Sequence, residues 1–181
     1  MIGGKNFYTL SDHIIFTRIT HEDKEKVREL KKINSIIFPQ AYNDIFYRKL
    51  LSIARFYLVY TFDNQLIGTL SFLLIDHSTL LDSHLKSLVL APSGNCCYIM
   101  NLGVISVYRK KGFGTHLWGF IRKNAEEYFG DRKFEYALHV QVKNTSAIKF
   151  YEKLGFERIG IAKDYYRGLE SLDALVMARN G

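Results

Sequence analysis

The sequence predicts an α/β fold in which strands and helices alternate around a mixed sheet. An apolar run at 96–105 reads as a buried strand, and an amphipathic helical pattern follows it at 113–129. A second strand–helix pair is predicted at 134–142 and 145–154, with Gly155 as the helix stop. Strand–helix–strand order implies a right-handed crossover, so the first and third of these segments should be parallel neighbours. A mixed sheet with helices on both faces follows.

The chain before this alternation begins with a β-rich segment and a helix. Residues 12–19 suggest a first strand, and apolar residues at near-helical spacing predict a helix over 21–36. Thr20 is expected to cap that helix, with Asp23 as an acid in its first turn. Phe38-Pro39 should end it, because proline disfavours the α region for the residue before it.

A second helix and a hairpin are expected next. Asn43 is suited to cap a helix whose apolar residues share one side. Residues 55–61 and 65–75 are rich in strand-forming residues and flank Asp63-Asn64, which predicts a strand, a turn and a strand.

The ends of the chain and one long connection complete a single domain over residues 1–181. Residues 1–10 are treated as a tail, and strands are expected at 156–162 and 172–179. The connection at 76–95 is long and rich in Ser, Asp, Pro and Gly. Long loops are either functional or poorly ordered, and both interpretations stay open here.

Composition bounds the class of protein. With 48% hydrophobic residues the chain can bury a sizeable core, yet no apolar run is long enough to span a bilayer. The N-terminus lacks the pattern of a signal peptide. The two cysteines are the adjacent pair Cys96-Cys97 at the head of an apolar strand, where buried free thiols are expected. No metal-ligand spacing is present, so we expect a metal-free cytoplasmic protein with no membrane partner.

The formal net charge of +7 favours an anionic partner. The basic residues are dispersed along the chain rather than gathered in a stripe, and no nucleic-acid-binding motif is present. We therefore expect no specific nucleic-acid partner.

The stretch from 98 to 115 organises the chain. Its apolar first half runs into a basic turn that contains two glycines, and a helix follows. The glycines let the backbone approach closely, and the first N–H groups of a helix have no internal partners, so a diphosphate would fit there. An ordinary β-to-α turn with a solvated basic rim is the alternative, and spacing alone leaves both open. The turn and helix start comprise Arg109, Lys110, Lys111, Gly112, Phe113, Gly114 and Thr115.

Two ordered motifs carry a resemblance to a known family. The Arg109–Gly114 segment resembles the Arg/Gln-x-x-Gly-x-Gly/Ala pyrophosphate loop of the GNAT family of acetyl-CoA-dependent N-acetyltransferases, and Asn144–Phe156 resembles that family's second motif. Four further segments resemble the catalytic subunit of the NatE type of N-terminal acetyltransferase, within a similarity that covers roughly 12–178. These segments are 38–44, 98–103, 138–141 and Tyr165-Tyr166.

The resemblance implies a GNAT fold and an acetyl-CoA site. That fold has a mixed sheet of about seven strands flanked by about four helices, and two central parallel strands splay apart for acetyl-CoA. Backbone N–H groups near Leu102 or Val104 should polarise the thioester carbonyl, and Tyr151 should lie near the CoA sulfur. Asn144 could bind the pantetheine arm, although a plain N-cap role is the alternative. The remaining cofactor-binding residues implied are Gly103, Ser146 and the seven of the 109–115 turn.

Tyr98 and His139 are the catalytic candidates that the resemblance implies. A free α-amine has a pKa of about 8, so it needs only modest help from a base near neutral pH. The two residues lie on neighbouring parallel strands and could approach one site. Without the motifs, His139 would be read as a strand histidine satisfied by the backbone, and Tyr98 as a partly buried core tyrosine.

The resemblance also implies a slot for the N-terminus of a protein that begins with Met and a hydrophobic residue. Two walls of this slot come from the 38–42 turn and the 165–166 hairpin, and the backbone of Met100 assists. Gln40 and Arg167-Gly168-Leu169 depart from the family pattern, which bears on the preference for the second residue. The substrate-binding residues implied are Phe38, Pro39, Gln40, Tyr42, Met100, Tyr165 and Tyr166.

Three other functions remain as alternatives. A lysine Nε-acetyltransferase faces an amine with a pKa of about 10.4 and typically uses a carboxylate base, and no matched catalytic position is Asp or Glu. Acetylation of a small amine would make a two-sided peptide slot superfluous. The chain could also be a weakly active subunit, since the resemblance implies association with the NatA complex and the ribosome.

Overall fold

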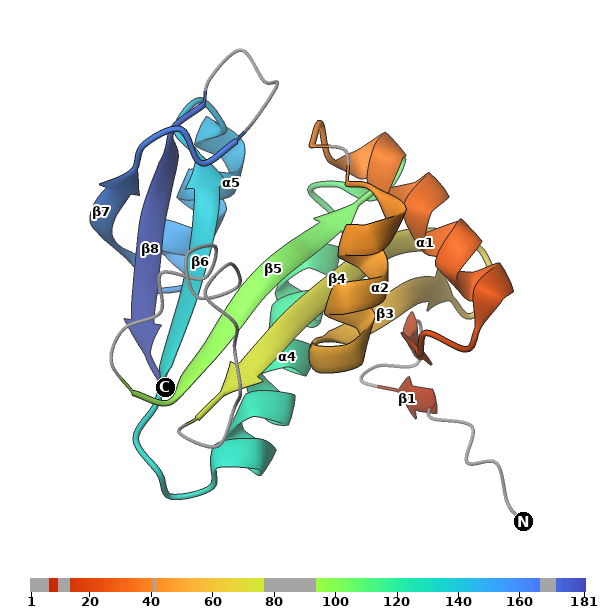
Figure 1. Cartoon of the computed structure of the whole chain (residues 1–181), viewed down its shortest axis with the longest axis horizontal. Helices are drawn as coiled ribbons and strands as arrows, with labels where there is room; N and C mark the ends of the chain where they lie inside the picture. Colours follow the sequence, from red (N-terminus) through yellow and green to blue (C-terminus); the bar gives the residue numbers. More distant parts are fainter. Residues whose placement is uncertain (1–6, 10–13, 41, 77–93, 167–171) are drawn as a thin grey trace. The chain divides into compact units, whose positions relative to one another are not determined.

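The computed structural model of the chain describes residues 7–9, 14–40, 42–76, 94–166 and 172–181 (Figure 1). The chain divides into two compact units. The first comprises Met1–Phe72 and Asn101–Lys123, and the second comprises Leu73–Met100 and Asn124–Gly181. No helix within the described ranges is long and apolar enough to cross a membrane.

Antiparallel strands form the sheet of the first unit. Its order is β1-β2-β3-β4, so strands that follow one another in the sequence are neighbours in the sheet. Phe16 of β2 is fully buried and stacks on Phe120 with ring centroids 4.0 Å apart. The strands are β1 (Phe7–Thr9), β2 (Ile14–Ile19), β3 (Arg55–Thr61) and β4 (Leu66–Ile75), whose last residues belong to the second unit.

The helices of the first unit are α1 (Lys24–Ile37), α2 (Asp44–Ile53) and the beginning of α4 (Phe113–Phe129). The expected cap on α1 is wrong by three residues. Asp23, not Thr20, is the N-cap residue, because the Thr20 N–H and hydroxyl both donate to the Asp23 carboxylate and close a turn ahead of the helix.

The segment from α1 to α2 is fixed at both ends. Phe38 ends α1 in an extended conformation (φ −116°, ψ 136°), as the following proline requires. The buried Asn34 amide donates to the Tyr47 hydroxyl at 3.0 Å and links the two helices. Lys31 and Asp44 add an exposed ion pair at 2.7 Å.

A mixed sheet forms the second unit, in the order β5-β6-β8-β7. The expected parallel neighbours are confirmed, since Cys96–Ile99 of β5 pairs in parallel with Glu135–Leu138 of β6. In the described residues this pairing stops before Met100 and His139, so the two strands part at that level. The strands are β5 (Cys96–Val104, whose last residues belong to the first unit), β6 (Glu135–Gln141), β7 (Glu157–Ala162) and β8 (Ala174–Asn180).

Helix α5 (Thr145–Lys153) connects β6 to β7. The Asn144 side chain caps its N-terminus by accepting from the Ala147 N–H at 3.1 Å. Gly155 has φ 84° and ends the helical segment as expected, because a left-handed residue is accessible to glycine at little cost.

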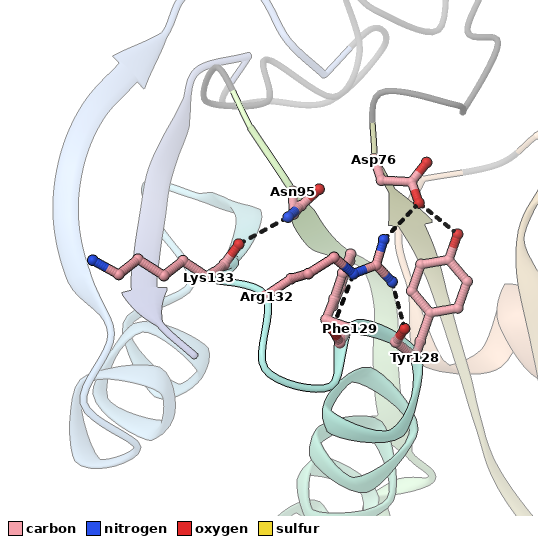
Figure 2. A network of polar contacts seen from close by, with 6 residues as sticks. All are labelled: Asp76, Asn95, Tyr128, Phe129, Arg132 and Lys133. Atoms are coloured by element: carbon pink, nitrogen blue, oxygen red, sulfur yellow. Dashed lines mark hydrogen bonds and ion pairs between the residues drawn. The ribbon is translucent and has the colours of Figure 1, made fainter.

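A polar network in the second unit joins the end of β4 to the end of α4 (Figure 2). The Asp76 carboxylate, whose side chain is only 7% exposed, accepts from the Tyr128 hydroxyl at 3.0 Å and from Arg132 at 3.3 Å. Arg132 also donates to the carbonyls of Tyr128 and Phe129, which terminates α4. This buried carboxylate is therefore paired, as burial of a charge requires.

Most expected elements are present in the described residues, with two additions. The seven expected strands are all present, and the short β1 is an eighth, in a segment treated as tail. A 3₁₀ turn, η1 (Ser106–Tyr108), follows β5. Of the 76–95 connection, residues 77–93 lie outside the described part of the chain.

Candidate active site

The register of β5 and β6 places Tyr98 and His139 on one face of the second unit's sheet. Tyr98 of β5 lies opposite Ala137 of β6, and His139 is two residues further along β6. Because side chains alternate along a strand, Ala137 and His139 share the face on which Tyr98 lies. His139 in turn pairs with Val176 of β8.

The two side chains meet in a direct hydrogen bond. The Tyr98 hydroxyl lies 2.8 Å from Nδ1 of His139, and a third residue, Tyr165, completes the group. The hydroxyls of Tyr98 and Tyr165 are 2.9 Å apart. The Tyr165 ring stacks on the His139 imidazole, with centroids 4.2 Å apart and planes within 1°. We name Tyr98, His139 and Tyr165 the aromatic triad.

Burial sets the charge state of the triad. It lowers the pKa of His139 to about 4, so the imidazole is neutral near pH 7 and able to accept a proton. Burial likewise raises the pKa of Tyr165, partly offset by its hydrogen bond to Tyr98. His139 Nε2 is buried and has no hydrogen-bond partner in the part of the chain that the structure describes.

Small residues of the last two strands support Tyr165 and its neighbour. Both tyrosines pack against a buried cluster made of Ala162, Ala174 and Val176. The Tyr166 N–H donates to the Leu172 carbonyl at 2.8 Å, and its hydroxyl donates to the His139 carbonyl at 3.4 Å. The sequence interpretation assigned Tyr165 to the peptide slot alone and missed its bond to Tyr98, because that bond joins residues 67 positions apart.

Helix α5 carries three of the expected cofactor residues. The side-chain oxygen of Asn144 is engaged as the N-cap, which confirms the alternative reading for that atom. Ser146 is exposed in the first turn, and Tyr151 is buried further along. Burial raises the pKa of Tyr151 above its usual range, so its hydroxyl stays protonated and able to donate.

The basic turn lies in the first unit and has the backbone of an anion site. Lys110 (φ 60°) and Gly112 (φ 85°) are both left-handed, which turns the chain sharply before α4 begins. The Gly112 carbonyl accepts from the N–H groups of Thr115 and His116, while the earlier N–H groups of a helix have no intrahelical acceptor. Arg109, Lys110 and Lys111 are exposed around this turn. Phe113 and Gly114, the first residues of α4, are half-buried.

These residues fit the diphosphate of acetyl-CoA. The left-handed residue at 112 is a glycine, so the backbone there is not screened by a side chain, and nothing lies within 4 Å of where its Cβ would be. The Arg109 Nε donates to the Val104 carbonyl at 3.1 Å, which directs the guanidinium back along the strand end. Lys111 Nζ lies 5.6 Å from the centre of the Tyr108 ring. A helix N-terminus with exposed cations is the donor set that a diphosphate requires.

The first unit also brings Gly103 of β5 close to Phe38, at the end of α1. A Cβ on Gly103 would lie 2.5 Å from Ile37 Cγ2 and 3.0 Å from Phe38 Cζ, so the Phe38 ring packs on the backbone of β5. Val104 is buried and Leu102 half-buried, as expected for packing residues. Next to them, Pro39 is exposed and Gln40 half-buried.

Of the two other expected peptide contacts, Tyr42 belongs to the first unit and Met100 to the second. Tyr42 packs edge-on against Tyr47, with ring centroids 6.3 Å apart. Met100, in the second unit, is half-buried at the point where β5 and β6 part. The departure noted at Arg167-Gly168-Leu169 lies outside the described residues. Among the residues that are described, no group of three or more His, Cys, Asp or Glu could hold a metal ion.

Known proteins similar to this chain agree on its class. The model of the acetyltransferase (GNAT) family matches residues 26–156. N-alpha-acetyltransferase 50 of Danio rerio is 35% identical over 85% of this chain and 82% of its own length. The probable N-acetyltransferase san of Drosophila melanogaster is 32% identical over 84% of this chain and 74% of its own length.

A solved structure agrees with the sequence relatives. Arabidopsis thaliana Naa50 in complex with the bisubstrate analogue CoA-Ac-MVNAL matches with a TM-score of 0.68 and 29% identity, over 91% of this chain and 97% of that one. The strand order, the basic glycine turn and the aromatic triad are thus accompanied by a family match over most of the chain. The chain belongs to the GNAT acetyltransferase family and is an N-terminal α-amine acetyltransferase.

Proposed function

We propose that this enzyme transfers the acetyl group of acetyl-CoA to the free α-amine of proteins that begin with Met followed by a hydrophobic residue. The observation that carries the proposal is the 2.8 Å bond between the Tyr98 hydroxyl and a neutral His139. A neutral imidazole that is bonded to a hydroxyl is a base of the modest strength that an α-amine needs, because the amine's own pKa is about 8.

Each group of residues has a separate task in this proposal. Acetyl-CoA supplies a thioester whose carbonyl is attacked by the amine. Arg109, Lys111 and the N–H groups at the start of α4 bind the diphosphate. Tyr98 and His139 take the proton that the amine releases. Tyr151, kept protonated by burial, donates a hydrogen bond to the leaving sulfur.

Aromatic residues support the proposed peptide preference. Phe38 and Tyr42 in the first unit, and Tyr165 and Tyr166 in the second, are half-buried, so each keeps an exposed portion for an apolar side chain. The analogue bound by the Arabidopsis relative has a peptide portion that begins with the letters MV, a methionine followed by an apolar residue. Methionine, the proposed first residue of the substrate, adapts to irregular apolar surfaces.

The proposal extends to partners and location. Nascent protein N-termini are available at the ribosome in the cytoplasm, and a net charge of +7 favours association with an anionic surface such as ribosomal RNA. We propose a cytoplasmic enzyme that works beside the NatA complex and the ribosome. Sedimentation with ribosomes at two salt concentrations tests this part independently of activity.

Two synthetic peptides of matched composition test the reaction. One has a free Met-Leu N-terminus, and the other has a blocked N-terminus and an internal lysine. We expect acetyl transfer from acetyl-CoA to the first peptide alone, detected by mass spectrometry. A third peptide that begins Met-Asp should react more slowly than Met-Leu, because a buried unpaired carboxylate is costly in an apolar slot.

Each other result changes the proposal. Transfer to the blocked peptide alone would move the enzyme to the lysine class and remove the roles given to Phe38, Tyr42 and Tyr165. Equal rates on Met-Leu and Met-Asp would reject the hydrophobic second-residue preference while leaving α-amine acetylation in place. No transfer to any peptide, with acetyl-CoA binding intact, would indicate a small-amine acceptor or a subunit that depends on its partner.

A further inference from the structure

We infer that Tyr165 is a positioning residue for the catalytic pair. Its hydroxyl donates to the Tyr98 oxygen, Tyr98 donates to His139 Nδ1, and Nδ1 is the nitrogen that receives the reaction's proton. The reaction in question is the acetyl transfer proposed above, so the kinetic part of this inference rests on that proposal. The tautomer that it assigns to His139 does not, because that can be measured on the enzyme alone.

The geometry of the aromatic triad allows two arrangements of hydrogens. Tyr98 carries one hydroxyl hydrogen and lies 2.8 Å from His139 Nδ1 and 2.9 Å from the Tyr165 hydroxyl. The bond between the Tyr98 oxygen and Nδ1 holds one hydrogen, and either Tyr98 or Nδ1 supplies it. If Tyr98 donates to Nδ1, the hydrogen of the neutral imidazole is on Nε2. If Nδ1 donates to Tyr98, that hydrogen is on Nδ1 and Nε2 carries the lone pair.

Burial of Nε2 distinguishes the two arrangements for catalysis. The atom is buried and has no partner among the described residues, so neither water nor substrate reaches it in this structure. In the second arrangement it would be the only basic nitrogen of the ring, and it would be sealed. In the first arrangement the basic nitrogen is Nδ1, which is reached through the Tyr98 hydroxyl. Only the first arrangement lets His139 act as a base.

The proton path then has three named atoms. As the substrate nitrogen forms its bond to the acetyl carbon, its proton passes to the Tyr98 oxygen, and the Tyr98 hydrogen moves to Nδ1. The carbon–sulfur bond breaks with its electron pair on sulfur, and the resulting imidazolium returns the proton through Tyr98 to the thiolate. The products are the acetylated amine and a thiol, so atoms and charge balance.

The ring and the hydroxyl of Tyr165 act on different groups, the ring on His139 and the hydroxyl on Tyr98. The ring stacks on the imidazole at 4.2 Å and contributes to its burial, whereas the hydroxyl alone directs the Tyr98 hydrogen. Tyr165→Phe keeps the ring and removes the hydroxyl. Tyr128→Phe is the matched control, since it removes a tyrosine hydroxyl bonded at 3.0 Å to Asp76, outside the triad.

Nitrogen-15 NMR of histidine-labelled wild-type enzyme tests the tautomer. The chain has six histidines, and comparison with His139→Gln identifies the signals of His139. We expect a hydrogen on Nε2 and an unprotonated Nδ1 near pH 7. In Tyr165→Phe the two nitrogen shifts should move toward each other, because Tyr98 is no longer held as a donor to Nδ1. A wild-type hydrogen on Nδ1 would overturn the inference.

Steady-state kinetics test the effect on the reaction. Loss of one hydrogen bond that orients the base should lower kcat by about tenfold in Tyr165→Phe, with the acetyl-CoA Kd unchanged. Tyr128→Phe should keep the wild-type kcat. Wild-type kcat and unchanged nitrogen shifts in Tyr165→Phe would reject the positioning role. A wild-type enzyme that acetylates no peptide α-amine would instead reject the proposed function, while the tautomer would still be measured.

Discussion

The aromatic triad and the basic turn differ in burial, in charge and in what shapes them. In the triad Tyr98 is buried, His139 and Tyr165 are half-buried, and the imidazole is neutral. Strand register brings Tyr98 and His139 together. The basic turn is exposed, carries three cations within three residues, and is shaped by two left-handed residues. The triad keeps its imidazole neutral, so that it can accept a proton, whereas the basic turn exposes positive charges that can bind an anion. Substitutions in the two regions should therefore affect different constants.

The largest effect is expected at His139. His139→Ala removes the proton acceptor and should lower kcat by about 10²–10⁴-fold, the usual contribution of general acid–base catalysis. The acetyl-CoA Kd, measured by calorimetry, should change less than about twofold, since the basic turn is untouched. Activity close to wild type would remove His139 from the mechanism.

Charge removal in the basic turn should act on binding instead. Arg109→Ala with Lys111→Ala should weaken acetyl-CoA binding by roughly 30–1,000-fold, because each of the two charge-assisted hydrogen bonds contributes about 1–2 kcal/mol. The salt dependence of the Kd should also become shallower. Lys24→Ala, an exposed lysine of α1, is the matched control and should leave the Kd unchanged. An unaltered Kd in the double variant would reject the diphosphate assignment.

Two glycines test how closely Phe38 packs on β5. Gly103→Ala places a Cβ 2.5 Å from Ile37 and 3.0 Å from Phe38, so overpacking should lower the free energy of unfolding by about 1–3 kcal/mol and raise the peptide KM. Gly119→Ala in α4 meets nothing within 4 Å and should raise that free energy by about 0.5–1 kcal/mol. Equal effects of the two substitutions in urea unfolding would contradict the close packing on Gly103.

Burial of a neutral His139 should also show in the pH dependence of stability. Its folded pKa of about 4 is below its unfolded value, so the unfolded chain binds more protons between about pH 4 and 6.5. The free energy of unfolding should therefore fall as the pH drops through this window, with His139 accounting for on the order of 1–2 kcal/mol. His139→Ala should flatten this part of the curve. The same slope in both proteins would mean that other groups cause it.

The two regions also differ in how far the sequence predicts them. The strand–helix–strand order predicts that 96–105 and 134–142 are parallel neighbours, and the register in the structure brings Tyr98 and His139 to one face. The position of Tyr165 does not follow, because it depends on a turn after β7 and on small residues of β8. Long-range packing of this kind leaves no local pattern in the sequence.

Some backbone conformations near the site can likewise be predicted from the sequence, and others cannot. Glycine at 112 signals a left-handed residue, and φ there is 85°. Lys110 is also left-handed, and nothing in a lysine predicts it. Thr20 has the right chemistry for an N-cap, yet its N–H and hydroxyl donate to the Asp23 carboxylate, and α1 begins after Asp23, whose side chain makes no cap hydrogen bond.

Initial rates of peptide acetylation as a function of acetyl-CoA concentration, for His139→Ala beside the Arg109→Ala/Lys111→Ala variant, test the division of labour most directly. The account predicts that His139→Ala saturates at the wild-type concentration with a far lower plateau. The basic-turn variant should reach a plateau near that of wild type, but only at higher acetyl-CoA. A lower plateau from the basic-turn variant, or weaker saturation in His139→Ala, would contradict the separation of binding from proton transfer.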